Sequence, residues 1–69
     1  MNFAQKVYFL RSKHGLSQAE LGKRANISQQ SIAGYERGRT IPPKNTLIQL
    51  AKVLGVEPED LTDEARSVS

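Results

Sequence analysis

The sequence predicts an all-α fold of five short helices around one hydrophobic core. Apolar residues recur at spacings of three and four in several segments, which is the pattern of amphipathic helices. Alternation with a period of two is weak throughout, so no sheet is expected. The length of 69 residues suits a single small domain. Because a chain of about this size buries only about 60% of its unfolded surface, a deep catalytic cavity is not expected.

The first helix is predicted over residues 3–14. Phe3, Val7 and Leu10 are separated by four and three positions, so their side chains share one face. Gly15 follows as the C-terminal cap, a position where glycine is common. His14 is expected in the last turn, close to the C-terminal end of the helix dipole.

The second helix is predicted from Ser17 to Ala25 and opens with a capping box. In this arrangement the Ser17 oxygen and the Glu20 carboxylate each accept a hydrogen bond from a backbone N–H that the helix leaves free. Asn26 follows, and we expect a tight turn there because asparagine adopts positive φ at modest cost.

The third helix is predicted to begin after Ser28, its N-cap, and to run to Arg37, with Gly38 just beyond its end. Ile32 and Tyr35 are three residues apart and are expected to point into the core. The glycine inside this helix is unusual, because glycine in a helix interior costs about 1 kcal/mol relative to alanine.

The rest of the chain is predicted as a loop, two helices and a tail. Adjacent prolines prevent residues 39–43 from continuing a helix. An amphipathic helix follows over residues 44–54, and Pro58 suits the first position of a short fifth helix. The domain is expected to span residues 1–62, followed by a polar C-terminal tail over residues 63–69.

The core is expected to form where the inward faces of the helices meet. Ile48 and Val53 lie off the core face of their helix and are either scattered surface residues or part of a dimer contact. The predicted core residues are Phe3, Val7, Leu10, Leu16, Leu21, Ala25, Ile27, Ile32, Tyr35, Leu47, Leu50, Ala51, Leu54, Val56 and Leu61.

The net charge of +3 is unevenly distributed. Residues 1–52 carry a charge of +7, whereas residues 53–69 carry −4. A basic body with a short acidic end is the electrostatic pattern of a protein that binds a polyanion such as nucleic acid, although a solvated basic surface would show the same balance.

Composition excludes several classes of site. There is no cysteine and only one histidine, so neither disulfides nor a zinc site can form. No nucleophile–base set and no Gly-rich phosphate loop is present, so we expect no enzyme and no cofactor. The first ten residues contain no apolar run long enough for a signal or spanning helix, and we expect a cytoplasmic protein without a membrane contact.

The second and third helices have the spacing of a helix-turn-helix. A turn of about four residues, "ANIS", joins them, and such pairs cross at about 90–120°. The outward face of the third helix is nearly uncharged and low in bulk, whereas a merely solvated face more often carries lysine and glutamate. This face comprises Gln29, Gln30, Ala33, Gly34 and Arg37.

Three motifs together resemble the Cro/C1-type, lambda-repressor-like helix-turn-helix family of phage repressors and bacterial regulators. They are "LSQAELG", "ISQQSIAGYERG" followed by proline, and "LIQLAKVLGV", and the resemblance covers residues 3–61. It implies a transcriptional regulator, most simply a repressor encoded by a bacterium or a phage. It also implies that the third helix lies in the DNA major groove and that a homodimer binds a two-fold symmetric double-stranded operator.

The resemblance implies that residues on the outward face of the third helix contact the bases. Gln29 and Gln30 fall in its first turn, and a glutamine amide pairs bidentately with the N6/N7 edge of adenine. Ala33 would place its methyl against a thymine methyl, and Arg37 completes the base-facing set. Gly34 either allows the wall of the groove to approach the helix closely or has no effect on binding. The chain departs from the family pattern at two places. Relatives often carry base-contacting side chains where this chain has Ala33 and Gly34, and they usually carry glycine at the position of Asn26.

Further positions are assigned to the DNA backbone and to a structural ion pair. Arg11 and Glu36 match positions that pair across the edge of the core in the family, and no catalytic dyad is expected there. Residues beside the recognition helix, or at the N-terminus of the helix before it, are placed for sugar-phosphate contact. These are Ser17, Gln18, Ser31, Arg39, Thr40 and Lys44.

A second class of function remains open from the sequence. A helical protein-interaction module, such as an antitoxin-like partner binder, would share this fold. Such a module would expose a large apolar patch, and beyond Ile48 and Val53 the sequence shows none.

Overall fold

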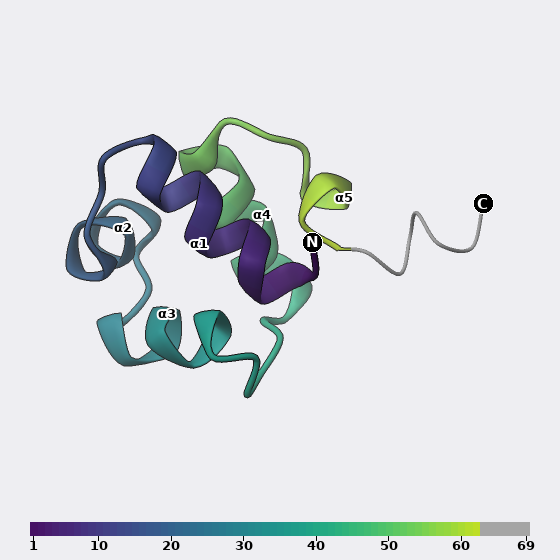
Figure 1. The fold of residues 1–69 in the computed structure, drawn as a ribbon, viewed down its shortest axis with the longest axis horizontal. Helices are drawn as coiled ribbons and strands as arrows, with labels where there is room; N and C mark the ends of the chain where they lie inside the picture. Colours follow the sequence, from purple (N-terminus) through teal and green to yellow (C-terminus); the bar gives the residue numbers. More distant parts are fainter. Residues whose placement is uncertain (63–69) are drawn as a thin grey trace.

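The computed structural model describes residues 1–62 of the chain. Within that range the structure has five helices and no strand, which confirms the predicted all-α class (Figure 1). The predicted tail over residues 63–69 lies outside the described residues. The helices are α1 (Phe3–Lys13), α2 (Gln18–Ala25), α3 (Gln29–Glu36), α4 (Lys44–Leu54) and α5 (Pro58–Leu61).

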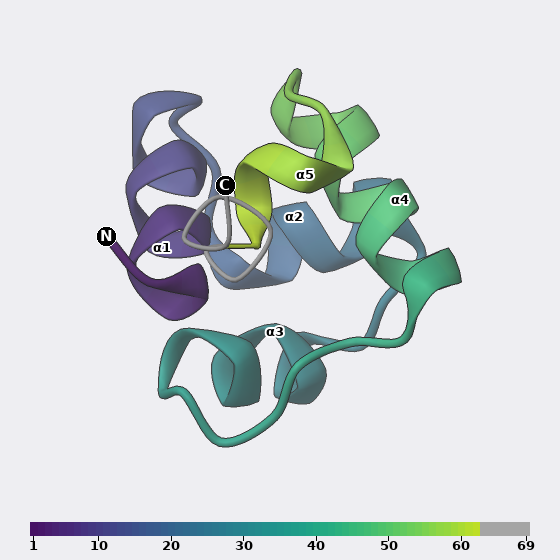
Figure 2. The ribbon, with the colours of Figure 1, turned by 90° about the vertical axis from the view of Figure 1, so that its right-hand side faces the viewer.

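The recognition helix predicted from the sequence, α3, lies along one side of the molecule. Figure 2 shows α3 below the other helices, with the loop from α3 to α4 running along its length. On its inner side α3 packs against α1 and α2, while α4 packs against α2 and α5. Within residues 1–62, the face of α3 turned away from α1 and α2 therefore has no helix packed against it.

Side-chain caps explain where the first three helices begin. The predicted capping box at α2 is present: Glu20 N–H donates to Ser17 Oγ at 3.0 Å and Ser17 N–H donates to Glu20 Oε1 at 2.8 Å. The bond from the Ser17 N–H lowers the pKa of the Glu20 carboxyl. Asn2 and Gln5 form a second such box at α1 that was not predicted. Ser28 caps α3 by accepting from Ser31 N–H at 3.1 Å.

Two helices end one residue earlier than predicted. His14 and Arg37 are the C-caps of α1 and α3 rather than their last helical residues. His14 also joins two helix ends, because its Nε2 lies 2.8 Å from the Leu54 carbonyl oxygen at the end of α4. A carbonyl oxygen only accepts hydrogen bonds, so Nε2 carries the proton in this contact.

The predicted core residues all lie in the core cluster or pack directly against it. The fully buried large side chains include Leu21, Ile32 and Leu50, which join α2, α3 and α4. Val53 was placed off the core face, and this is wrong: it is half-buried and packs against the cluster. The error follows from the geometry of α4, whose buried stripe is wider than the one traced by Leu47, Leu50 and Leu54. Ile48 is 43% exposed, as expected.

The turn between α2 and α3 depends on two residues. Asn26 has φ of 60° and ψ of 44°, which is the left-handed conformation predicted for it. Gly22 is buried inside α2 where the chain after the turn folds back, and its carbonyl accepts from Ile27 N–H at 2.7 Å. A Cβ at position 22 would collide with the Ile27 backbone oxygen.

Gly22 and Gly34 offer a matched pair of substitutions inside helices. Gly22→Ala should lower the free energy of unfolding by about 1–3 kcal/mol, because the methyl would force the turn apart. Gly34→Ala should raise it by about 0.5–1 kcal/mol, because the nearest atom is Thr40 Oγ1 at 3.7 Å and alanine favours the helix. Chemical denaturation measures both. Equal effects of the two changes would mean that the close approach at Gly22 does not constrain the turn.

Candidate nucleic-acid interface

The outward face of α3 presents two glutamines whose side chains are free. Gln29 and Gln30 are exposed, and neither forms a hydrogen bond within the described part of the chain. Each amide therefore offers both donors and an acceptor to a ligand. Arg37, just past the end of the helix, is also exposed. The face thus has polar groups at both ends.

Between those ends the face is recessed. Ala33 and Gly34 are half-buried, and neither carries a polar side chain. The threonine after the helix approaches this segment, with Thr40 Oγ1 lying 3.7 Å from the position that a Cβ of Gly34 would take. A surface that follows α3 could therefore approach its backbone closely in the middle of the helix.

Burial of the inner face fixes the orientation of α3. Ile32 has no exposed surface and Tyr35 is 7% exposed, so both anchor the helix in the core. The Tyr35 ring packs edge-on against Phe3 of α1, with centroids 6.0 Å apart. Because the inner face is immobilised in this way, the glutamines on the other face have a defined direction.

The residues assigned to phosphates fall into two groups. Arg39, Thr40 and Lys44 are exposed along the loop from α3 to α4 and at the start of α4. Ser17 and Ser31 are already engaged in helix caps: Ser31 Oγ accepts from Ser28 Oγ at 2.9 Å, which leaves its own O–H available. Gln18 is half-buried and donates from Nε2 to Glu36 Oε1 at 3.1 Å.

The N-terminus of α4 is a feature that the sequence analysis missed. Pro43 is its N-cap and no side chain caps the helix, in contrast to α1, α2 and α3. The first backbone N–H groups of α4 are thus left for an outside acceptor, next to the positive charge of Lys44. The signal was available in the sequence, since proline cannot supply a capping oxygen.

Arg11 and Glu36 form an ion pair between α1 and α3. Arg11 Nε and Nη2 donate to the two Glu36 oxygens at 2.5 and 3.0 Å, and the side chains are only 13% and 7% exposed. Arg11 Nη1 also donates to the Leu16 carbonyl at 2.8 Å. These bonds to Glu36 raise the pKa of the guanidinium above its ordinary value. The Tyr8 ring lies 5.3 Å from the same guanidinium.

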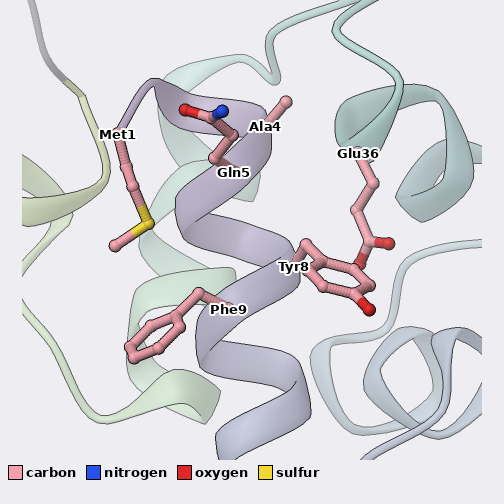
Figure 3. Close-up of a pocket in the computed structure, with 6 residues that line it drawn as sticks. All are labelled: Met1, Ala4, Gln5, Tyr8, Phe9 and Glu36. Carbon is pink, nitrogen blue, oxygen red and sulfur yellow. The ribbon is translucent and has the colours of Figure 1, made fainter.

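Two apolar hollows lie away from the outward face of α3. One, of about 340 Å³, is lined by Met1, by residues of α1 and by Glu36. Figure 3 shows Met1 and Phe9 on one side of α1 and Tyr8 beside Glu36 on the other. A second, of about 370 Å³, lies between α4 and α5. Its lining residues are Lys44, Leu47, Ile48, Pro58, Glu59 and Thr62.

Residues 1–62 offer neither a metal-binding cluster nor a membrane-spanning helix. No group of three or more histidine, cysteine or acidic side chains in that range could hold a metal ion. None of the five helices is long and apolar enough to cross a membrane.

Comparison with known proteins matches the chain to one family and to DNA-binding regulators. The family model described as "Helix-turn-helix" matches residues 7–61. The uncharacterized HTH-type transcriptional regulator y4dJ of Sinorhizobium fredii is 44% identical over 66 residues, covering 91% of this chain and 80% of its own.

Two repressors are also similar. The immunity repressor protein of Bacillus phage phi105 is 31% identical over 93% of this chain, which corresponds to 44% of the repressor. Among solved structures, the P22 c2 repressor in complex with a synthetic operator superimposes with a TM-score of 0.87 at 31% identity. That match covers 90% of this chain and 94% of the repressor chain.

Proposed function

Because the chain belongs to the Cro/C1-type helix-turn-helix family, with the lambda-repressor-like fold, we propose that it is a sequence-specific DNA-binding transcriptional regulator of the repressor type. The observation that carries the proposal is the face of α3: two free, exposed glutamine amides beside a recessed apolar segment. Within residues 1–62, the α3–α4 loop approaches this face beside Gly34, through Thr40, and leaves both glutamine side chains exposed. A B-DNA major groove admits a helix of this size. The protein is further proposed to act in the cytoplasm, encoded by a bacterial or phage genome.

The proposed base contacts follow the chemistry of each side chain. Gln29 and Gln30 pair with adenine edges, and the Ala33 methyl meets a thymine methyl. Gly34 lets the groove wall approach the helix backbone. Arg37, about one turn further along, contacts another base edge; an arginine most often pairs with guanine there.

The proposed phosphate contacts surround this helix. Arg39, Thr40 and Lys44 contact the backbone on the side of the α3–α4 loop, together with the uncapped N-terminus of α4. Ser17, Gln18 and Ser31 contact it at the N-terminal ends of α2 and α3. Such contacts orient the protein on the duplex but carry no sequence information.

The protein is proposed to bind as a homodimer on a two-fold symmetric operator. The support is the hollow between α4 and α5, which begins at Lys44 close to the DNA-facing loop and contains the exposed Ile48. A second copy seated there would bury this side chain. Two-fold related recognition helices contact half-sites about one helical turn of DNA apart.

Binding to DNA should depend steeply on salt. If the complex neutralises about four to six phosphates, log K should fall against log salt with a slope of about −3.6 to −5.4. In the homodimer Arg39→Ala and Lys44→Ala each remove two such contacts, so each should make the slope shallower by about 1.8 and weaken preferred and random duplexes alike. Fluorescence anisotropy over a range of salt concentrations measures both quantities.

Lys52→Ala is the matched control for Lys44→Ala. Both lysines are exposed on α4, but Lys44 begins the helix beside the α3–α4 loop, whereas Lys52 lies in its last turn. The control should leave the slope unchanged. A flat salt response of the unmodified protein would contradict the proposed function.

A further inference from the structure

Glu36 connects the ion pair of the core edge to the start of α2. Its Oε1 accepts from Gln18 Nε2 at 3.1 Å and from Arg11 Nη2 at 3.0 Å, while its Oε2 accepts from Arg11 Nε. Side chains of α1, α2 and α3 therefore meet at one carboxylate. We propose that Glu36 is a positioning residue that directs the Gln18 amide toward a DNA phosphate, with Arg11 cancelling the charge of Glu36. This inference rests on the proposed function.

The chemistry of the two groups determines how Gln18 is oriented. A carboxylate only accepts hydrogen bonds, so the amide must turn its nitrogen, not its oxygen, toward Glu36. One of the two N–H bonds is then used and the other remains to donate to a second acceptor. Without Glu36 the Gln18 amide could present either its nitrogen or its oxygen to the DNA at nearly equal free energy. A phosphate only accepts hydrogen bonds, so the molecules that present the oxygen would make no bond to it.

The charge of Glu36 explains why Arg11 belongs to this arrangement. A phosphate oxygen that accepts the second N–H would lie about 5 Å from the Glu36 oxygen. Two negative charges at that distance repel each other. Arg11 donates to both carboxylate oxygens, so the pair is nearly neutral before a phosphate approaches. Tyr8 covers the guanidinium, and Figure 3 shows its ring beside Glu36.

The test is a double-mutant cycle on DNA affinity. Gln18→Met keeps the length of the side chain but removes the donor. Glu36→Gln keeps the shape but presents an amide N–H to Arg11 or to Gln18. Each change should weaken binding to the preferred duplex by about 10- to 150-fold per half-site, the effect of one hydrogen bond to a charged group. The double variant should bind no more weakly than either single variant. Gln49→Met, on the exposed side of α4, is the control and should change nothing.

A duplex with one neutral phosphate identifies the partner. Methylphosphonates are introduced one at a time along the half-site. When the phosphate that Gln18 contacts is replaced, the unmodified protein should bind the duplex more weakly. Gln18→Met and Glu36→Gln have already lost this contact, so the replacement should not reduce their affinity further. Losses of Gln18→Met and Glu36→Gln that multiply in the double variant would overturn the positioning role. In that case the unmodified protein still selects a duplex, so the proposed function stands; absence of any selective, salt-dependent binding would instead remove the function itself.

The unmodified protein allows the same test if Glu36→Gln does not fold. The two Nε2 protons of Gln18 give separate NMR signals. In the free protein one of them should exchange slowly with water, and on the preferred duplex the other should become slow as well. Two equally fast protons in the free protein, or no change of the second on DNA, would overturn the proposal.

Discussion

Arg11→Met is expected to lower the free energy of unfolding by about 3–5 kcal/mol, the cost of removing one partner of a buried ion pair. The side chains of Arg11 and Glu36 are 13% and 7% exposed, so the carboxylate left behind has little access to water. It also lies at the C-terminal end of α3, where the helix dipole disfavours negative charge. The Leu16 carbonyl loses its donor in the same variant.

Thermal and chemical denaturation of four variants test this expectation: Arg11→Met, Glu36→Met, the double variant and a control. Arg11→Met should be far less stable than the double variant Arg11→Met, Glu36→Met, in which no charge is left unpaired. Lys13→Met is the control, since Lys13 is exposed on the same helix and should change stability by less than about 0.5 kcal/mol. If the effects of the two single changes simply add, Arg11 and Glu36 do not interact energetically.

Gln30→Ala is expected to reduce affinity for the preferred operator by about 1–3 kcal/mol per half-site, that is, about 5- to 150-fold. The side chain is exposed and makes no hydrogen bond within residues 1–62, so the melting temperature should hardly change. Affinity for random DNA, where phosphate contacts dominate, should also change little. The consequence is a loss of discrimination at one base pair in each half-site with an unchanged salt slope.

Competition binding with every base pair of the half-site varied in turn measures this loss. Gln49→Ala is the control, because it removes an equally exposed glutamine from α4 rather than α3. Equal weakening on preferred and random duplexes would show that Gln30 only orients the helix. Base recognition would then have to come from Gln29 and Arg37.

The helices were predictable because their signals are local. Ser17, Glu20 and Ser28 mark the starts of α2 and α3 through bonds to residues three positions away. The box of Asn2 and Gln5 has the same spacing but was not recognised, because asparagine replaces the usual serine or threonine. Val53 was misplaced because the width of a buried stripe depends on which neighbours pack against it, and here those lie in other segments of the chain.

The candidate site was only partly predictable. The exposed face of α3 follows from helical periodicity once Ile32 and Tyr35 are placed inward. The bond between Gln18 and Glu36 joins residues 18 positions apart in different helices, and no periodic pattern encodes it. The pairing of Arg11 with Glu36 came from family resemblance, not from spacing. The contact of the Tyr8 ring with Arg11 was within reach of the sequence, because the two residues are three positions apart on α1.

The central claim is that α3 recognises base sequence in double-stranded DNA. Selection of bound duplexes from a random pool, followed by affinity measurement on the selected and a scrambled duplex, tests it most directly. We expect an inverted repeat whose half-sites are centred about one helical turn apart, with adenines facing Gln29 and Gln30. The selected duplex should bind at least about 1,000-fold more tightly than the scrambled one at the same salt concentration. A pool that enriches no common sequence, with equal affinity for both duplexes, would contradict the claim.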